Sequence, residues 1–212
     1  MALPAIGVGG GRIEVFSSED LQCLFSKHES LENASQQDAL DFHAVLESIF
    51  KQVMVIPFRF PTVLHSEADL GAHLRLHGEG YRQDLHRFGQ LVQMELHLSA
   101  KEAQPALRAN SSGTEYLKAR SQNTQALASA AQQSRQLLGE MLRDWQQVAP
   151  LGEDQRTLRC YALIARSDMQ RFREKLVSLS VPASVTMALS GPWPPTAFMS
   201  SVANGATALP LP

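Results

Sequence analysis

The chain of 212 residues has few cysteines, almost no net charge and no long apolar run, and each shortage excludes a class of protein. Cys23 and Cys160 are its only cysteines, so neither a disulfide framework nor a cysteine-based zinc site is expected. A formal net charge of −2 provides no broad basic field for nucleic acid or anionic lipid. No apolar run reaches the roughly 18 residues needed to cross a bilayer. The N-terminus also lacks the features of a signal peptide, so we expect a soluble cytoplasmic protein without a membrane or nucleic-acid partner.

Groups of residues that would perform catalysis are also missing. His73 and His77 have the i, i+4 spacing that can hold a metal on one helix face, but no third ligand is evident. We favour a polar helix edge for this pair over a metal site. Residues 7–11 are glycine-rich but lack the Lys-Ser/Thr of a phosphate loop. His43 is expected at the edge of the core, because no nucleophile accompanies it. We therefore expect no enzyme, no cofactor and no metal.

Hydrophobic periodicity predicts an α+β fold. Capping pairs, Ser35 with Asp38 and Ser66 with Asp69, mark the starts of two helices in the first half. The strand expected around Pro57 and Pro61 should be bulged or lie at a sheet edge. The elements expected in the first half are strands 12–16 and 21–25, helix 38–53, strand 55–64, helix 66–88 and strand 92–99.

The aperiodic segment around Pro105 predicts a domain boundary, which gives domains 1–104 and 105–212. The elements expected after it are a long helix 114–148, strand 158–164, helix 169–179, strand 185–189 and a proline-rich tail. Within the long helix, residues 121–134 contain no Asp, Glu, Lys or Arg. This neutral surface suggests close packing, either on the first domain or on a partner protein.

The tail is the most distinctive stretch of the chain. Three prolines within four residues exclude a helix or a central strand, so the segment should be rigid and extended. We favour a tail that folds back and buries Trp193 over a proline-rich ligand for another protein's aromatic groove. The residues of this motif are Gly191, Pro192, Trp193, Pro194, Pro195 and Phe198.

Three motifs, in this order along the chain, resemble those of the gas vesicle GvpL/GvpF family. The tail Ser190–Phe198 resembles the family's Ser-Gly-Pro-Trp-Pro-Pro-Tyr-Ser-Phe ending, with Thr196 and Ala197 at the two positions that differ. Upstream, the family's Leu-Pro-x-Arg-Phe-Gly-Thr-Val segment is matched around Pro57, Arg59 and Phe60. Its Gly-x-x-Tyr-Leu helix start is matched by Gly113, Tyr116 and Leu117, and a histidine before Val-Leu by His43.

The resemblance implies two small α+β domains, at least one of them ferredoxin-like, and the β-β-α-β-α-β order of the first half is compatible with that. It also implies a gas vesicle accessory or structural protein that binds the hydrophobic shell-forming subunit and takes part in nucleation and assembly. Its partners would be the shell protein and other accessory proteins, and the residues of the three motifs and His43 would be the candidate interaction residues. The alternative is an unrelated ferredoxin-like regulatory or RNA-binding module. For Arg59, an ion pair with a helix carboxylate is favoured over a protein contact.

Overall fold

A computed structural model describes residues 4–28, 34–101, 113–148 and 156–200. Within them the chain is α+β, with four α-helices and two antiparallel sheets. It divides into two compact units, one of residues 1–90 with 193–212 and the other of residues 91–192. We call these unit 1 and unit 2.

Unit 1 begins with a glycine-rich 3-10 turn, Val8–Gly10, followed by a hairpin of two antiparallel strands. A capping box between Ser35 and Asp38 starts the next helix, and the Ser66 side chain caps the one after it. A segment without helix or strand joins the two helices. The elements are β1 (Ile13–Ser18), β2 (Leu21–Ser26), α1 (Gln36–Phe50) and α2 (Glu67–Phe88).

The hairpin of unit 1 packs on α2. Alternate residues of β2 turn inward, where Leu21 and Cys23 meet Leu70, Leu74 and Tyr81 of the helix. At the hairpin turn, Arg82 of α2 pairs with both Glu19 and Asp20. A two-stranded hairpin is marginal alone, so its stability depends on this helix contact.

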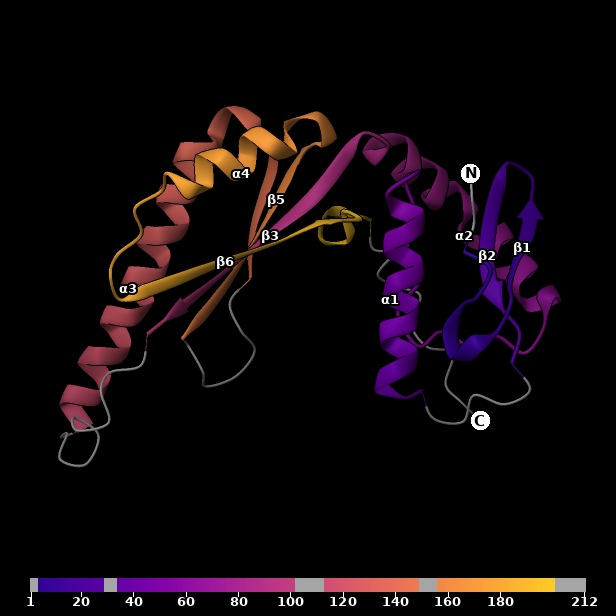
Figure 1. Ribbon diagram of the computed structural model, residues 1–212, viewed down its shortest axis with the longest axis horizontal. Coiled ribbons are helices and arrows are strands. Elements are labelled where there is room, and N and C mark those ends of the chain that lie inside the picture. Colours follow the sequence, from indigo (N-terminus) through magenta and orange to yellow (C-terminus); the bar gives the residue numbers. More distant parts are fainter. Residues whose placement is uncertain (1–3, 29–33, 102–112, 149–155, 201–212) are drawn as a thin grey trace. The chain divides into compact units, whose positions relative to one another are not determined.

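Unit 2 has the chain order strand, helix, strand, strand, helix, strand, and its strands form one sheet in the order β4-β5-β3-β6 (Figure 1). Both β3 and β4 pair antiparallel with β5, and β6 is an edge strand beside β3. The elements are β3 (Leu91–Ala100), α3 (Gly113–Leu138), β4 (Leu142–Val148), β5 (Thr157–Ala165), α4 (Met169–Val177) and β6 (Val185–Trp193).

The core of unit 2 lies between this sheet and its helices. The inward side chains of β3 are fully buried, as are those of β5, and α3 packs on both strands and on α4. Phe172 of α4 is also fully buried. The fully buried inward residues of the two strands are Val92, Met94, Leu96, Leu98, Cys160, Ala162 and Ile164.

Most expected elements are confirmed to within a few residues, with two exceptions. Residues 55–64 form no strand, because the prolines at positions 57 and 61 remove backbone donors that a sheet requires. The long helix ends at Leu138, and Leu142–Val148 is strand β4 instead. Trp145 lies within the range expected to be helical, yet it pairs across from Ala162 of β5.

The expected domains 1–104 and 105–212 do not coincide with the two units. The difference arises because β3 pairs with β5 and therefore belongs with the second half of the chain. The β-β-α-β-α-β order expected for the first half is not found in unit 1, because residues 55–64 form no strand and β3 belongs to unit 2. The boundary segment around Pro105 and the segment 149–154 lie outside the described residues.

Candidate functional site

Near the end of β6, the C-terminal motif has a backbone position that only glycine can occupy without strain. Gly191 has a φ of +110°, and a Cβ built on it would lie 2.9 Å from the Gln93 carbonyl oxygen of β3. The Gly191 carbonyl accepts a hydrogen bond of 3.1 Å from the Arg173 guanidinium of α4. The Gly191–Pro192 peptide bond is cis. The contacts of Gly191 with Gln93 and Arg173 join the first half of the motif to unit 2.

The second half of the motif belongs to unit 1 and ends in a 3-10 turn, Thr196–Phe198. Pro194, Pro195 and Phe198 are buried, and the 3-10 turn departs from the extended tail that the prolines predicted. Trp193 is partly buried, and the expectation that its ring is largely enclosed stays a prediction. Its ring centroid lies 5.0 Å from that of His43, so two of the family-motif positions meet.

Ser200 and Asp84, neither of which the sequence analysis singled out, anchor the tail. Ser200 donates two hydrogen bonds to the Asp84 carboxylate of α2, from its amide at 3.2 Å and its hydroxyl at 2.9 Å. Asp84 is only 4% exposed. Asp84 lies on the buried side of α2, between Tyr81 and Phe88. Its sequence signal is a carboxylate at helical spacing among apolar residues, because a buried carboxylate needs hydrogen-bond partners.

Pro57, Arg59 and Phe60 lie in the segment that joins α1 and α2. The Phe60 ring packs on Phe42 of α1, with ring centroids 5.2 Å apart. Arg59 is exposed, and no carboxylate among the described residues pairs with it. The ion pair favoured for Arg59 is therefore absent from the part of the chain that the structure covers, while its carbonyl accepts a hydrogen bond from the Thr62 hydroxyl.

No described contact joins the remaining candidate residues to the C-terminal motif. Tyr116 and Leu117 lie in the first turns of α3, and their side chains are outside the described part of the chain. His73 and His77 face one another on α2 with ring centroids 4.6 Å apart. The His73 Nε2 atom is 2.7 Å from the Tyr81 hydroxyl. Among described residues, no group of three metal-ligating side chains occurs.

Burial shifts the pKa values of His73 and of both cysteines toward their uncharged forms. Burial, with a smaller contribution from the charge of His77, lowers the pKa of His73. Burial raises the pKa of the Cys23 thiol to about 11 and that of Cys160 to about 12. Both thiols are therefore protonated at neutral pH and are poor nucleophiles.

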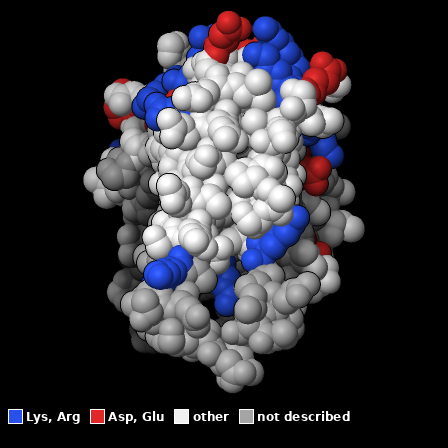
Figure 2. Space-filling model, turned by 90° about the vertical axis from the view of Figure 1, so that its left-hand side faces the viewer, with Lys and Arg blue, Asp and Glu red and all other residues white. Residues whose placement is uncertain are grey.

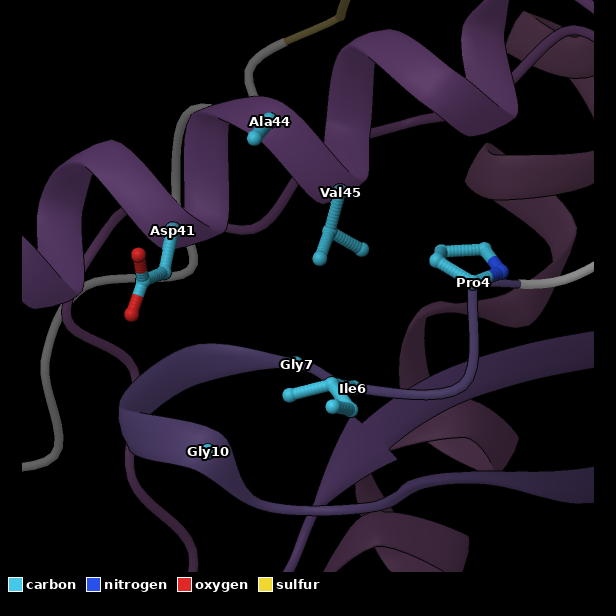
Figure 3. Close-up of a pocket in the computed structure, with 7 residues that line it drawn as sticks. All are labelled: Pro4, Ile6, Gly7, Gly10, Asp41, Ala44 and Val45. Atoms are coloured by element: carbon cyan, nitrogen blue, oxygen red, sulfur yellow. The ribbon is translucent and has the colours of Figure 1, made fainter.

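A shallow groove in unit 1 lies between the glycine-rich turn and the outer face of α1 (Figure 3). Ile6 and Val45 face one another across it, and Asp41 is the one carboxylate among the described residues of its lining. Pro4, Gly7, Gly10 and Ala44 complete the lining. The groove is open and mostly apolar, so it has the character of a contact surface and not of a catalytic pocket.

Comparison with known proteins decides the family. The sequence profile described as "Gas vesicle synthesis protein GvpL/GvpF" matches residues 1–200. The chain belongs to this family. The family description names gas vesicle synthesis and no reaction, and no curated protein matches the chain. The resemblance drawn from the three motifs is confirmed.

Two crystal structures of GvpF share this fold. The gas vesicle protein GvpF from Anabaena sp. PCC7120 matches with a TM-score of 0.73 at 14% identity, over 90% of this chain and 86% of that chain. GvpF from Microcystis aeruginosa matches with a TM-score of 0.67 at 12% identity, over 88% of each chain. At these identities the likeness concerns the fold. No helix in the described residues is long and apolar enough to span a membrane.

Proposed function

We propose that this GvpL/GvpF-family protein is a gas vesicle accessory protein that binds the hydrophobic shell-forming subunit and takes part in nucleating and assembling the shell. The observation that carries the proposal is the family match over residues 1–200. A shell subunit with an apolar, gas-facing surface aggregates unless another protein covers that surface or directs its addition to the shell. The protein would act in the cytoplasm and on the vesicle, beside other accessory proteins.

The family-motif residues divide into two roles under this proposal. The buried prolines and Phe198 shape the tail, while Arg59 is exposed on a segment without helix or strand and is available to a partner. Trp193 offers the exposed part of its ring beside His43. An exposed arginine and a partly exposed tryptophan are residue types enriched where proteins bind one another.

We also propose that unit 2 is a ferredoxin-like domain. Support comes from its β-α-β-β-α-β chain order and from a sheet in which the first and third strands of the unit are central neighbours. In this arrangement α3 and α4 are the two helices that follow the first and third strands. An RNA-binding role would need exposed aromatic and basic residues on the sheet. Family membership favours the vesicle function.

Co-expression with the shell protein of the same organism tests the function. We expect the tagged chain to retain the shell subunit on an affinity column and to increase its soluble fraction. The Arg59→Glu variant should bind less while its melting temperature stays unchanged, because the side chain is exposed. Arg12→Glu, another exposed arginine of unit 1, is the matched control and should bind as the wild type does. Equal recovery of shell subunit with and without the chain would refute the function.

A further inference from the structure

A cluster of rings around His73 holds the segment between α1 and α2 on α2. The Phe58 ring centroid of the segment lies 5.5 Å from that of His73 and 6.0 Å from that of Tyr81. Within α2, the His73 Nε2 atom is 2.7 Å from the Tyr81 hydroxyl, and the His73 and His77 ring centroids are 4.6 Å apart. We call Phe58, His73, His77 and Tyr81 the His73 cluster. His73 is its centre, because it contacts each of the other three.

Only the two histidines of the His73 cluster change charge between neutral and mildly acidic pH. Burial, with a smaller contribution from Cys23, raises the pKa of Tyr81 to about 12. The Cys23 thiol of β2, whose pKa burial raises to about 11, is likewise uncharged. A proton gained by His73 therefore meets a second histidine and groups without charge.

The described part of the chain pairs no carboxylate with either histidine of the cluster. The Asp69 carboxylate, one helical turn before His73, accepts a hydrogen bond of 2.8 Å from the Ser66 hydroxyl at the start of α2. Arg59, the charged residue next to Phe58, is exposed and would carry the same sign as a protonated histidine. A positive charge on His73 has no ion-pair partner among these residues.

A proton on His73 favours a state in which this ring is better hydrated. Burial, with a smaller contribution from the charge of His77, lowers the pKa of His73. By linkage, a contact that lowers the pKa of a base is weakened when that base takes up a proton. Protonation of His77 as well would place two like charges on rings whose centroids are 4.6 Å apart. Acidification should therefore move a neighbour away from His73.

Phe58 is the neighbour that the backbone fixes least. His77 and Tyr81 share α2 with His73, so the hydrogen bonds of the helix keep all three together. Positions 54–65, in contrast, form no backbone–backbone hydrogen bond within the described residues. The segment has a second contact two residues further on, where Phe60 packs on Phe42 of α1. That second contact joins two phenylalanines and contains no titratable group.

We infer that the His73 cluster is a pH-sensitive latch, in which protonation of His73 releases Phe58 from α2 while Phe60 keeps the segment on α1. The latch is closed at neutral pH and opens as the pH falls below 6.5, through the lowered pKa of His73. The segment also carries Pro57 and Arg59, so the latch changes where these family-motif residues are presented. The latch is independent of the proposed function, because all of its contacts lie within the described residues of unit 1.

Nuclear magnetic resonance of the full chain, with labelled phenylalanine and histidine rings, tests the latch between about pH 7.5 and about pH 5. The Phe58 signals should move toward those of a solvent-exposed ring, with the midpoint at which the His73 signals titrate. The population of the released state should rise about tenfold for each unit by which the contact lowers the pKa of His73. The Phe42 and Phe60 signals should stay in place. Phe58 signals that do not move while His73 titrates would overturn the inference.

Three histidine variants assign the effect to the latch. His73→Gln keeps a hydrogen-bonding side chain that takes up no proton, so its Phe58 signals should stay in the closed position throughout. His77→Gln should move the midpoint to higher pH, because the like charge that lowers the pKa of His73 is gone. His65→Gln, at an exposed histidine of the same segment, is the matched control and should titrate as the wild type does.

Two results of these titrations would overturn the latch. Movement of the Phe58 signals in His73→Gln as in the wild type would assign the change to another group. Movement of the signals of Phe172, which is fully buried in unit 2, together with those of Phe58 would show acid unfolding of the whole chain.

Discussion

The two units of this protein are stabilised in different ways. Unit 2 buries the inward side chains of a four-stranded sheet beneath α3 and α4. Unit 1 has a two-stranded hairpin, and charged side chains hold its margins to α2. The Lys27 Nζ atom of unit 1 lies 3.0 Å from a carboxylate oxygen of Glu14 in β1 and 2.8 Å from one of Glu67 in α2. Arg82 of α2 forms an ion pair with Asp20 at the hairpin turn.

This difference predicts how each unit responds to perturbation. Apolar burial in a packed sheet is insensitive to salt and pH, whereas exposed ion pairs are screened by salt. Truncation of a core side chain should therefore have its largest effect in unit 2. Changes in pH and ionic strength should act first on unit 1.

Phe172→Ala should give the largest loss, about 3–5 kcal/mol of unfolding free energy, because the ring is fully buried in the unit 2 core. Urea denaturation monitored by circular dichroism measures it. Phe58→Ala in unit 1 is the comparison, since that ring is only partly buried against the hairpin core, and its cost should be smaller. Equal costs for the two variants would contradict the contrast between the units.

Gly191→Ala should cost about 3 kcal/mol, the upper part of the range for a strained backbone position, because the new Cβ also meets the Gln93 carbonyl. Thermal unfolding measures the loss. Gly10→Ala is a matched control: Gly10 also has a positive φ, of +77°, but nothing lies within 4 Å of its Cβ position. A Gly191→Ala variant no less stable than Gly10→Ala would show that crowding at β3 is unimportant.

Asp84→Ala should cost about 2 kcal/mol, because it leaves the Ser200 amide without its buried, charged acceptor. Ser200→Ala removes only the hydroxyl bond and should cost about 1 kcal/mol. Urea denaturation of both variants measures these losses, and hydrogen exchange at the Ser200 amide should accelerate in Asp84→Ala alone. Unchanged exchange there would refute the role of Asp84 as anchor.

The smallest effect expected is a dependence on pH that arises in unit 1. The pKa of His73 in the folded chain is lowered from 6.5 by burial and by the charge of His77. Its contribution to stability is therefore fully present above pH 6.5 and is lost as the pH falls through the folded-state pKa. His73→Gln should flatten stability against pH below pH 6.5, as measured by urea denaturation, and the exposed His86→Gln should not. Parallel profiles for wild type and His73→Gln would contradict this.

Local signals in the sequence were sufficient for most elements. Both capping pairs predicted helix starts that the structure confirms, since a cap depends only on residues three apart. Alternation predicted β3 and β5 for the same reason. The expected helix 114–148 extended wrongly through Trp145, because the spacing of apolar residues in a short edge strand can fit a helix as well.

The candidate site was less predictable than the fold. The three motifs identified the family, but no motif pointed to Asp84, whose partner Ser200 is 116 residues away. The prolines of the tail say nothing about what covers the Trp193 ring, and only the tertiary structure places that ring beside His43. Figure 2 shows a broad uncharged area around residues 121–134 of α3, and the exposure of this neutral helix face likewise depends on which side of α3 the sheet occupies.

The sequence by itself determined the local elements, the family and the absence of charge on residues 121–134, because each depends on residue type and short spacing. The tertiary structure alone decided that β3 pairs with β5 and that the tail rejoins unit 1. It also decided that the Asp84 carboxylate accepts from Ser200. These contacts join residues far apart in the chain, and their choice depends on which apolar faces can be buried together, a property that no local pattern contains.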